Sequence, residues 1–353
     1  MNKTFPRNVE ALTTDWLDKA FAQKPNAPRV LDSKTDRIIW GTATKVLMNA
    51  TCKDAAGNTF NKDICVKGGF DERLRQYYDL GVMFLQEAVF YRDVAPQLDI
   101  LLPECLYADD NGSDGVVVLE NLAARGATFG DPTKPLTPNQ ALPILEMMAE
   151  LHAVTWNWPT SKYPWLVLGS PSQRDGITAM AAGDRFRELS TRPQVARSIT
   201  PPYGDGELMM SALRYLWERD DKSSALALGH GDAHIGQLYF EPDGRAGLLD
   251  WQSIAMMPYA KDIAYFLGSA LTVDDRRAHE RDLIAAYLQA LQKRGGPKIA
   301  LSETWEEYRA QMLQGMVWIV VTENMQPIEV IETLNERYLT AMRDLDTLGA
   351  LGF

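Results

Sequence analysis

The feature that most constrains the fold of this chain is a change of character near residue 125. Before that point, β-branched runs such as RIIWGTATKVLMNATC and KDICVKGGF flank the turn-forming stretch KDAAGNTFN. After it come long segments with helical spacing of apolar residues, such as LTPNQALPILEMMAELHAVTW and VIETLNERYLTAMRDL. The pattern predicts an α+β chain that is rich in strands at first and mainly helical afterwards.

The length of the chain requires more than one hydrophobic core. At 353 residues it exceeds the size at which a single core stops growing, so we expect two lobes. Residues 1–119 are expected to form a strand-rich lobe and residues 125–353 a helical one, with a hinge at 120–124. Within the helical lobe, residues 157–208 are rich in Pro, Gly and Arg and are expected to form a lid or insertion.

Composition argues against several classes of protein. The formal net charge of −11 disfavours non-specific nucleic-acid binding, which needs clustered Lys and Arg. The three cysteines lack metal-type spacing and favour a reducing compartment. The first residues lack the apolar core of a signal peptide, and the run GMVWIVV is too short to cross a bilayer. We therefore expect a cytoplasmic protein that binds neither nucleic acid nor membrane, and the sequence leaves its oligomeric state open.

The stretch LGHGDAHIGQLYF, residues 228–240, concentrates polar side chains in a short loop. His230 and His234 are spaced as two zinc ligands on one helix face would be. However, Gly231 and Gly236 each disfavour a helix by about 1 kcal/mol relative to alanine, and the glutamate of an H-E-x-x-H site is missing. A metallohydrolase that uses both histidines with Asp232 is thus a minor alternative.

The sequence after this loop predicts a β-hairpin. QLYF, EPDG and RAGLLDW read as a strand, a four-residue turn and a second strand. If Phe240 pairs with Arg245, Asp250 falls opposite Ile235. Asp250 would then lie within a residue or two of Gln237.

Such a hairpin gathers two carboxylates and an amide at one end. A carboxylate on a loop, here Asp232, can orient and deprotonate an attacking hydroxyl group. A second carboxylate, Asp250, and the amide oxygen of Gln237 can hold Mg²⁺ against nucleotide phosphates. This is the arrangement used for phosphoryl transfer by kinases.

The pattern HGDAHIGQLYF…GLLDWQ resembles that of the aminoglycoside phosphotransferase and choline kinase-like family, most closely its ecdysteroid-kinase-like branch and bacterial relatives. Other pieces resemble the family in chain order: ICVKGGF, FLQEAVFYRDVAPQL, VVVLENL, MAELHAVTW and AKDIAYFLGSAL. The resemblance runs from about residue 35 to 292. It implies a bilobal protein-kinase-like fold and an ATP-dependent O-phosphotransferase that acts on a small-molecule alcohol.

The resemblance also implies a role for individual residues. Asp232 would be the catalytic base, and Gln237 and Asp250 would bind Mg²⁺. Gln237 stands where the family usually has Asn. Lys67, paired with Glu87, would align the α- and β-phosphates of ATP.

The remaining nucleotide contacts are expected in the strand-rich lobe. WGTATKV occupies the position of the phosphate loop but has a single glycine, so Thr42, Thr44 and backbone N–H groups would cover the phosphates. Glu120 and Leu122 of the hinge would contact adenine through backbone groups. Glu72 stays open as a rival to Glu87.

Charge and aromatic content predict the acceptor. Residues 156–217 contain five acidic and seven basic side chains, although the whole chain carries a net charge of −11. They also contain aromatic side chains suited to a ring-shaped or apolar ligand, namely Trp156, Trp158, Tyr163, Trp165 and Trp217. We therefore expect a neutral, fairly apolar or aromatic alcohol. Residues 303–346, with nine acidic and three basic side chains, keep an aminoglycoside or other antibiotic kinase open as an alternative.

Two further alternatives use the same fold. The unusual Gln237 and the glycine-poor phosphate loop are compatible with a nucleotide-binding pseudokinase that acts as a scaffold. A protein kinase is disfavoured because the chain lacks an Arg before Asp232 and an A-P-E segment after DWQ.

Overall fold

The structure, a computed structural model, describes residues 5–77 and 81–353. By its contacts the chain forms two compact units. The first unit contains residues 1–128 together with 241–245 and 250–253. The second contains residues 129–240, 246–249 and 254–353. Two short segments from late in the sequence therefore belong to the first unit, and one of them carries Asp250.

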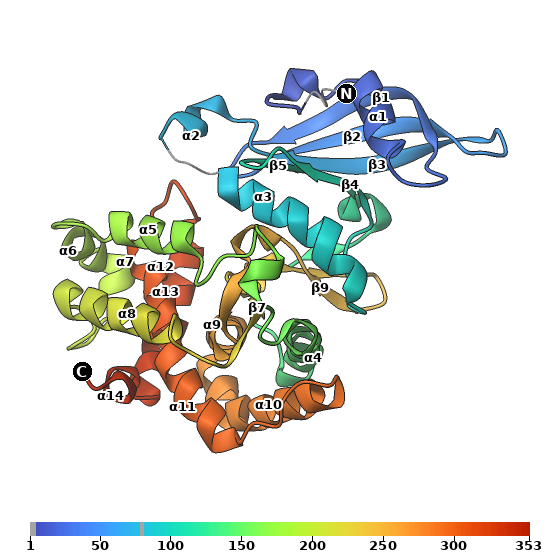
Figure 1. The fold of residues 1–353 in the computed structure, drawn as a ribbon. Helices are drawn as coiled ribbons and strands as arrows, with labels where there is room; N and C mark the ends of the chain where they lie inside the picture. Colours follow the sequence, from blue (N-terminus) through green and yellow to red (C-terminus); the bar gives the residue numbers. More distant parts are fainter. Residues whose placement is uncertain (1–4, 78–80) are drawn as a thin grey trace. The chain divides into compact units, whose positions relative to one another are not determined.

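The first unit is built on an antiparallel sheet (Figure 1). In the described part of the chain the strand order is β1-β2-β3-β5-β4. The strands are β1 (Arg29–Ile39), β2 (Thr44–Lys53), β3 (Thr59–Gly68), β4 (Cys105–Asp110) and β5 (Gly115–Glu120). Along β2, buried side chains alternate with more exposed ones, the period of two that a half-buried strand requires.

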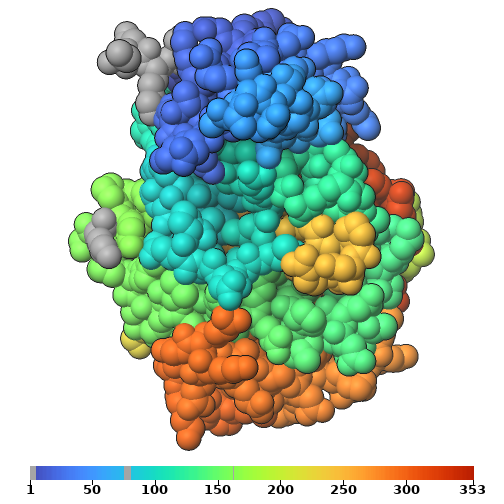
Figure 2. Space-filling view, turned by 90° about the vertical axis from the view of Figure 1, so that its right-hand side faces the viewer, coloured from blue at the N-terminus to red at the C-terminus, as the bar shows by residue number. Residues whose placement is uncertain are grey.

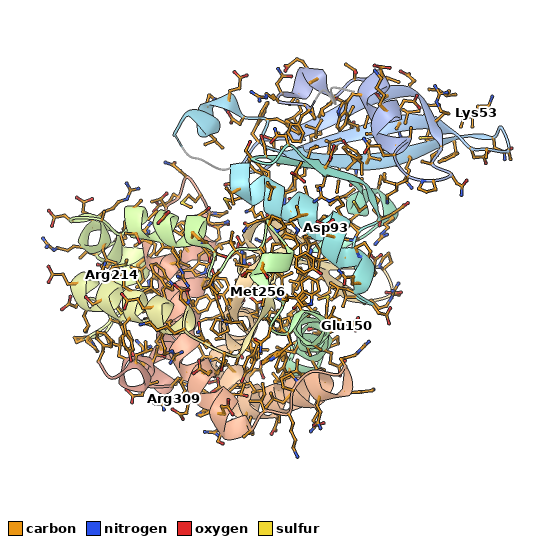
Figure 3. The ribbon with its side chains drawn as sticks, viewed as in Figure 1. Lys53, Asp93, Glu150, Arg214, Met256 and Arg309 are labelled. Carbon is orange, nitrogen blue, oxygen red and sulfur yellow. The ribbon has the colours of Figure 1, made fainter. Side chains whose placement is uncertain are left out.

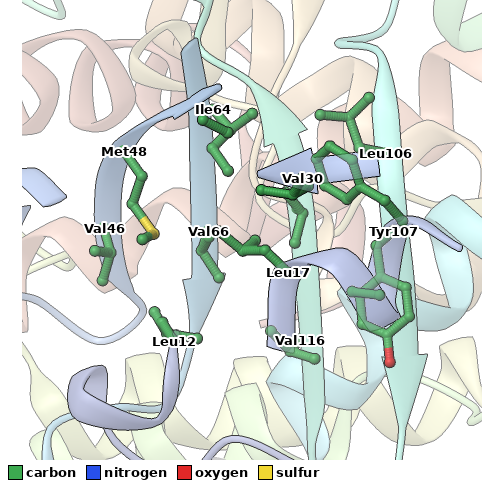
Figure 4. Packing of buried hydrophobic residues seen from close by; sticks show 14 of the residues in the cluster. Leu12, Leu17, Val30, Val46, Met48, Ile64, Val66, Leu106, Tyr107 and Val116 are labelled. Carbon is green, nitrogen blue, oxygen red and sulfur yellow. The ribbon is translucent and has the colours of Figure 1, made fainter. Parts of the chain in front are cut away.

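One face of this sheet forms the hydrophobic core of the first unit with α1 (Thr14–Phe21). Leu17 of α1 belongs to the same buried cluster as Val46, Ile64 and Val66 of the central strands (Figure 4). Because side chains alternate along a strand, Lys67 points away from this cluster. The lysine thus lies on the face that the core does not use.

Short helical segments complete the first unit. They are η1 (Val9–Ala11), α2 (Glu72–Tyr77), α3 (Gly81–Val89), the π-helical η2 (Phe90–Val94), η3 (Ala95–Gln97), η4 (Leu122–Arg125) and η7 (Trp251–Ser253). Asp71 caps α2 by accepting a hydrogen bond from the Arg73 N–H at 3.0 Å. Helix α3 packs against β5, where Gly115 permits a close approach: a Cβ there would stand 2.1 Å from the Phe84 carbonyl oxygen.

The second unit is mainly helical (Figure 1). Its helices are α4 (Pro138–Thr155), η5 (Thr160–Lys162), α5 (Pro171–Met180), α6 (Arg185–Ser190), α7 (Pro193–Ala196), α8 (Gly206–Asp220), η6 (Ile235–Gln237), α9 (Ala260–Ala270), α10 (Val273–Lys293), α11 (Leu301–Gln311), η8 (Met312–Met316), α12 (Val317–Val320), α13 (Ile328–Asp344) and α14 (Thr347–Leu351). Helix α4 begins with a capping box formed by Thr137, just before the helix, and Gln140 in its first turn. Every residue of α9 is buried, so this helix forms the centre of the unit.

The remaining strands are short. They are β6 (Thr128–Phe129), β7 (Leu226–Gly229), β8 (Leu238–Phe240), β9 (Ala246–Leu248) and β10 (Ala255–Pro258). Strands β7 and β10 pair antiparallel. Met256 of β10 lies among the interior side chains of the second unit, whereas Arg214 extends outward from α8 (Figure 3).

The hairpin of β8 and β9 is present, but the expected register is wrong by one residue. Phe240 pairs with Ala246 and not with Arg245. The reason lies in the turn, where Gly244 has a φ of +88° and adds a left-handed residue to the loop. The turn, coloured gold in Figure 2, lies exposed at the surface.

The predicted α+β class, with a strand-rich N-terminal part and a mainly helical remainder, is confirmed. Within residues 5–77 and 81–353, no helix has the length and apolarity to cross a membrane.

Candidate active site

Helix α9 holds the loop that follows β7. Asp262 accepts a hydrogen bond from the His230 N–H at 2.6 Å and one from the Gly231 N–H at 3.0 Å. Gly231 has a φ of +80°, a conformation that residues with a Cβ rarely adopt. The segment AKDIAYFLGSAL resembles the family in sequence, but nothing in that pattern identified Asp262 as the residue that fixes this loop.

Asp262 is fully buried and nevertheless favours its ionised form. Burial alone would raise its pKa. His152, whose Nε2 lies 3.4 Å away, and the N–H groups of the loop outweigh burial, so the pKa of Asp262 lies below its usual value. His152 is itself buried, with its Nδ1 2.7 Å from the hydroxyl of Tyr287.

The two histidines of the loop brace its backbone. His230 Nδ1 accepts a hydrogen bond from the Asp232 N–H, and its Nε2 donates one to the Leu249 carbonyl at 2.8 Å. His234 Nδ1 accepts one from the Gly236 N–H at 3.0 Å. In the part of the chain that the structure describes, no three His, Cys, Asp or Glu side chains gather as a metal site. These contacts favour bracing over zinc ligation.

The structure brings Asp232 and Gln237 together. Gln237 Nε2 donates a hydrogen bond to Asp232 Oδ2 at 3.0 Å, and His234 Nε2 lies 3.9 Å from the same oxygen. The Asp232 side chain is 24 % exposed, so a ligand can reach it. Burial and the negative charge of Asp232 raise the pKa of Tyr265, which places that phenol in the electrostatic field of the carboxylate.

In the first unit the structure brings Lys67, Glu87 and Asp250 together. Lys67 Nζ donates to Glu87 at 2.8 Å and to Asp250 at 2.7 Å. The lysine side chain is 5 % exposed. Burial by itself would lower the pKa of Lys67, but the two carboxylates outweigh it and raise the pKa above its usual value. Lys67 is therefore a buried ammonium held by two carboxylates.

Asp250 stands where the ladder of the β8–β9 hairpin ends. The N–H of Leu249 donates to the Gln237 carbonyl at 2.8 Å, and Asp250 directly follows Leu249. Asp250 has a φ of +65°, which turns the chain away from the ladder. The next residue, Trp251, is stacked on Phe90 with the ring centroids 3.8 Å apart. This stack anchors the Asp250 segment to the first unit.

The other residues that were expected to contact the nucleotide differ in their exposure and in their hydrogen-bond partners. Thr42 is exposed in the bend before β2, whereas Thr44 is fully buried and its hydroxyl has no hydrogen-bond partner among the described residues. The side chain of Glu120 is engaged by the Glu104 N–H and by Arg125 at 2.7 Å. The Glu120 N–H also donates to the Glu104 carbonyl at 2.9 Å, so a ligand would have to use the backbone carbonyl of Glu120.

The aromatic residues that were expected to line the acceptor site pack mainly on one another. Trp158 is stacked on Tyr163 with ring centroids 4.7 Å apart, and Tyr163 contacts Trp165. The neighbouring Asn157 is hydrogen-bonded to Leu226, at the end of β7 remote from the Asp232 loop. Counting aromatic residues in the sequence therefore could not tell which aromatic side chains lie near Asp232.

Comparison with known proteins gives the family of the chain. The model of the ecdysteroid kinase-like family matches residues 43–162 and 205–295, which together make up more than half of the sequence. The chain belongs to the ecdysteroid kinase-like family. The relationship suspected from the sequence motifs is thus confirmed, and with it the expected class of enzyme, a kinase-type phosphotransferase. Residues 163–204, between the two matched ranges, lie inside the expected insertion.

Several solved structures match this chain at low sequence identity. The choline kinase LicA from Streptococcus pneumoniae is 15% identical with a TM-score of 0.47, and the match covers 90% of this chain and 94% of that one. A choline/ethanolamine kinase family protein from Mesorhizobium loti is 17% identical with a TM-score of 0.46, covering 96% and 98%. Macrolide 2'-phosphotransferase MphH from Brachybacterium faecium is 18% identical with a TM-score of 0.40, covering 86% and 92%. A search of curated proteins gave no match.

Proposed function

We propose that this protein is an ATP-dependent O-phosphotransferase that acts, with Mg²⁺, on a hydroxyl group of a small molecule. The observation that carries the proposal is the buried lysine between two carboxylates, Lys67 with Glu87 and Asp250. A charged lysine fixed on a strand by a helix glutamate is the device by which kinases align the α- and β-phosphates. Family membership supports the same activity.

The nucleotide would be bound by the first unit. Lys67 would contact the phosphates, with Glu87 keeping it in place. Thr42 and the backbone N–H groups of the stretch up to Thr44 would cover the phosphates. The Thr44 side chain itself is buried and lies on the opposite face of the sheet from Lys67, because its neighbour Lys45 is the residue that pairs with Lys67. Backbone groups of Glu120 and Leu122 would receive adenine.

The side chains proposed for Mg²⁺ suit this ion, because Mg²⁺ prefers oxygen ligands. Asp250 offers a carboxylate, and Gln237 offers its amide oxygen, since its amide nitrogen already donates to Asp232. The Leu249–Gln237 hydrogen bond also brings the backbone of Gln237 within one residue of Asp250. Bound Mg²⁺ would supply positive charge to the phosphate oxygens.

Asp232 would act as the catalytic base. Its carboxylate would accept the proton of the acceptor hydroxyl while that oxygen attacks the γ-phosphorus and the bond to ADP breaks. Gln237 holds one carboxylate oxygen, which orients the base toward its substrate. The loop contacts to Asp262 and His230 fix the backbone that carries it.

The acceptor would be a neutral, fairly apolar alcohol. Tyr265 lies in the field of Asp232 and accepts a hydrogen bond from Trp318, whose ring contacts His234. The ammonium of Lys261 also interacts electrostatically with Asp232. Aromatic surfaces and a buried cation near the base disfavour a polycationic acceptor such as an aminoglycoside.

The three free cysteines agree with a cytoplasmic location.

The test is ATP turnover with a panel of alcohols that differ in charge and polarity. We expect ADP formation with neutral, apolar members and little with polycations. Nucleotide binding without phosphoryl transfer to any alcohol would support the pseudokinase scaffold instead. Efficient phosphorylation of kanamycin-type substrates that is lost at high salt would support an antibiotic kinase.

A further inference from the structure

Gly231, the residue before Asp232, has both of its backbone groups bound by side chains. Its N–H donates to Asp262 at 3.0 Å, and its carbonyl accepts a hydrogen bond from Gln173 Nε2 at 3.0 Å. The carbonyl belongs to the peptide that joins Gly231 to Asp232. The N–H of that same peptide donates to His230 Nδ1. Gln173 and His230 therefore fix the plane of the peptide from which the Asp232 side chain departs.

Lys261 determines which way the Gln173 amide faces. Its Nζ donates to Gln173 Oε1 at 3.1 Å, and the lysine side chain is buried. An ammonium has donors only, so it can pair only with the amide oxygen. The amide nitrogen is then left to face the Gly231 carbonyl. Without the ammonium, the Gln173 side chain could rotate or flip, and the hydrogen bond to the loop would lose its geometry.

The two residues that act on the Gly231 carbonyl, Lys261 and Gln173, both lie on helices that are anchored in the second unit. Lys261 and Asp262 are adjacent on the buried helix α9, so one turn of that helix holds Gly231 directly and through Gln173. Gln173 lies on α5, within residues 163–204, which fall between the two ranges matched by the family model. The next residue of α5, Arg174, pairs with Asp221 through two hydrogen bonds of 2.8 and 2.9 Å. Helix α5 is thus fixed independently of the loop.

From these contacts we infer that Gln173 and Lys261 are positioning residues for phosphoryl transfer, acting through the Gly231–Asp232 peptide on the orientation of the Asp232 carboxylate. The inference rests on the proposed function, because it assigns Asp232 as the base. It gives residues 163–204 a task in the reaction, namely to hold the catalytic loop. A displacement of about 1 Å of a reacting group can cost up to ~10²-fold in rate, so a single such contact is expected to be visible in kcat.

The sharpest variant is Gln173→Glu. The carboxylate has nearly the same shape and keeps a partner for Lys261, but it has no N–H to donate to Gly231. We expect kcat to fall about tenfold while KM for Mg·ATP and the melting temperature stay close to those of the parent. Lys261→Met should lower kcat in the same way. A double variant, Gln173→Met with Lys261→Met, should be no slower than Lys261→Met alone, because the Gln173 contact is already lost when Lys261 no longer orients its amide.

The matched control is Asp175→Asn, which removes an exposed carboxylate of α5 and leaves both Gln173 and the Arg174–Asp221 pair in place. We expect it to keep the kcat of the parent. A kcat of Gln173→Glu within twofold of the parent, an equal fall in Asp175→Asn, or a multiplicative loss in the double variant would overturn the inference.

Hydrogen exchange separates this inference from the proposed function. In Gln173→Glu, the backbone amides of residues 229–237 should exchange faster than in the parent, and in Asp175→Asn they should not. If the parent protein transfers no phosphate to any alcohol but this pattern is found, the proposed function fails while the positioning contact stands. Unchanged exchange in Gln173→Glu contradicts the positioning contact whatever the activity.

Discussion

Asp250 combines three features that a single side chain rarely has together. It ends a hairpin ladder, adopts a left-handed backbone conformation with φ of +65°, and forms an ion pair with a buried lysine. Asp is among the few residues with a side chain that tolerate this conformation without large strain. The chain therefore turns at the same residue whose carboxylate pairs with Lys67.

The first prediction concerns this carboxylate. Asp250→Ala removes one partner of Lys67 and the proposed Mg²⁺ ligand, so Mg²⁺-dependent binding of ATP should be lost in calorimetry. The control is Asp243→Ala in the exposed hairpin turn, where Asp243 pairs with Arg245 of the same turn. It should bind Mg·ATP as the parent does. Unchanged Mg·ATP affinity in Asp250→Ala would refute the assignment.

Sequence motifs could indicate some residues of the site and not others. Asp232 and Lys67 stand in short segments whose residue types are typical of their chemistry. Asp262 and Gln173 act on the backbone of Gly231, 31 and 58 residues away in the sequence. Such side-chain contacts leave no local pattern, so only the folded chain reveals them.

At the scale of elements, a glycine sets the distance between α3 and β5. These are the helix that carries Glu87 and a strand that pairs with the Lys67 strand. A Cβ at Gly115 would lie 2.1 Å from the Phe84 carbonyl and 2.8 Å from the Leu85 nitrogen, and backbone atoms cannot move aside cheaply. Close packing of these two elements therefore depends on the absence of a side chain.

The second prediction compares two glycine substitutions. Gly115→Ala should destabilise the protein by roughly 1–3 kcal/mol, because α3 must move off the sheet. Gly176→Ala, inside helix α5 with nothing within 4 Å of the added Cβ, should stabilise it by about 0.5–1 kcal/mol. Urea denaturation measures both. Equal stability of the two variants would contradict this account of α3 packing.

The hairpin shows why an element can be predicted and its register missed. The alternation of QLYF and AGLL and the turn residues between them were sufficient for the hairpin. The pairing depended on one backbone angle at Gly244, which a sequence pattern does not specify. A left-handed glycine lengthens the loop by one residue and shifts every pair in the ladder.

At the scale of the whole molecule, chain length and the change of character near residue 125 were enough to predict two parts of different class. They could not predict that residues 241–245 and 250–253 belong to the first unit. That assignment follows from tertiary contacts, such as the stacking of Trp251 on Phe90 and the pairing of Lys67 with Asp250.

The free energy of unfolding should depend on pH through one buried carboxyl group, that of Asp220. Burial raises the pKa of Asp220 to about 6, although Gln311 donates to it at 2.8 Å. Because this pKa is higher in the folded than in the unfolded chain, the contribution to stability is present below about pH 4. It is lost as the pH rises toward 6.

The third prediction follows from this loss of stability with rising pH. Asp220→Asn keeps an oxygen that can accept from Gln311 but carries no charge, so it should stabilise the protein at pH 8 by on the order of 1–3 kcal/mol. The fall of the melting temperature between pH 4 and 6 should become shallower. Asp282→Asn, an exposed position on α10, serves as the control and should leave both unchanged. An equal effect of the two variants would contradict burial as the cause.

The central claim is that Asp232 is the base of an ATP-dependent phosphotransferase, and the rate of phosphoryl transfer by Asp232→Asn tests it most directly. The measurement is ADP formation with the best alcohol of the panel, alongside ATP affinity by calorimetry. Asn keeps the shape of the side chain and an oxygen that can accept from Gln237, but it cannot take the proton of the acceptor. The account predicts a loss of turnover of ~10²-fold or more with ATP affinity unchanged. Turnover within a few-fold of the parent would contradict it.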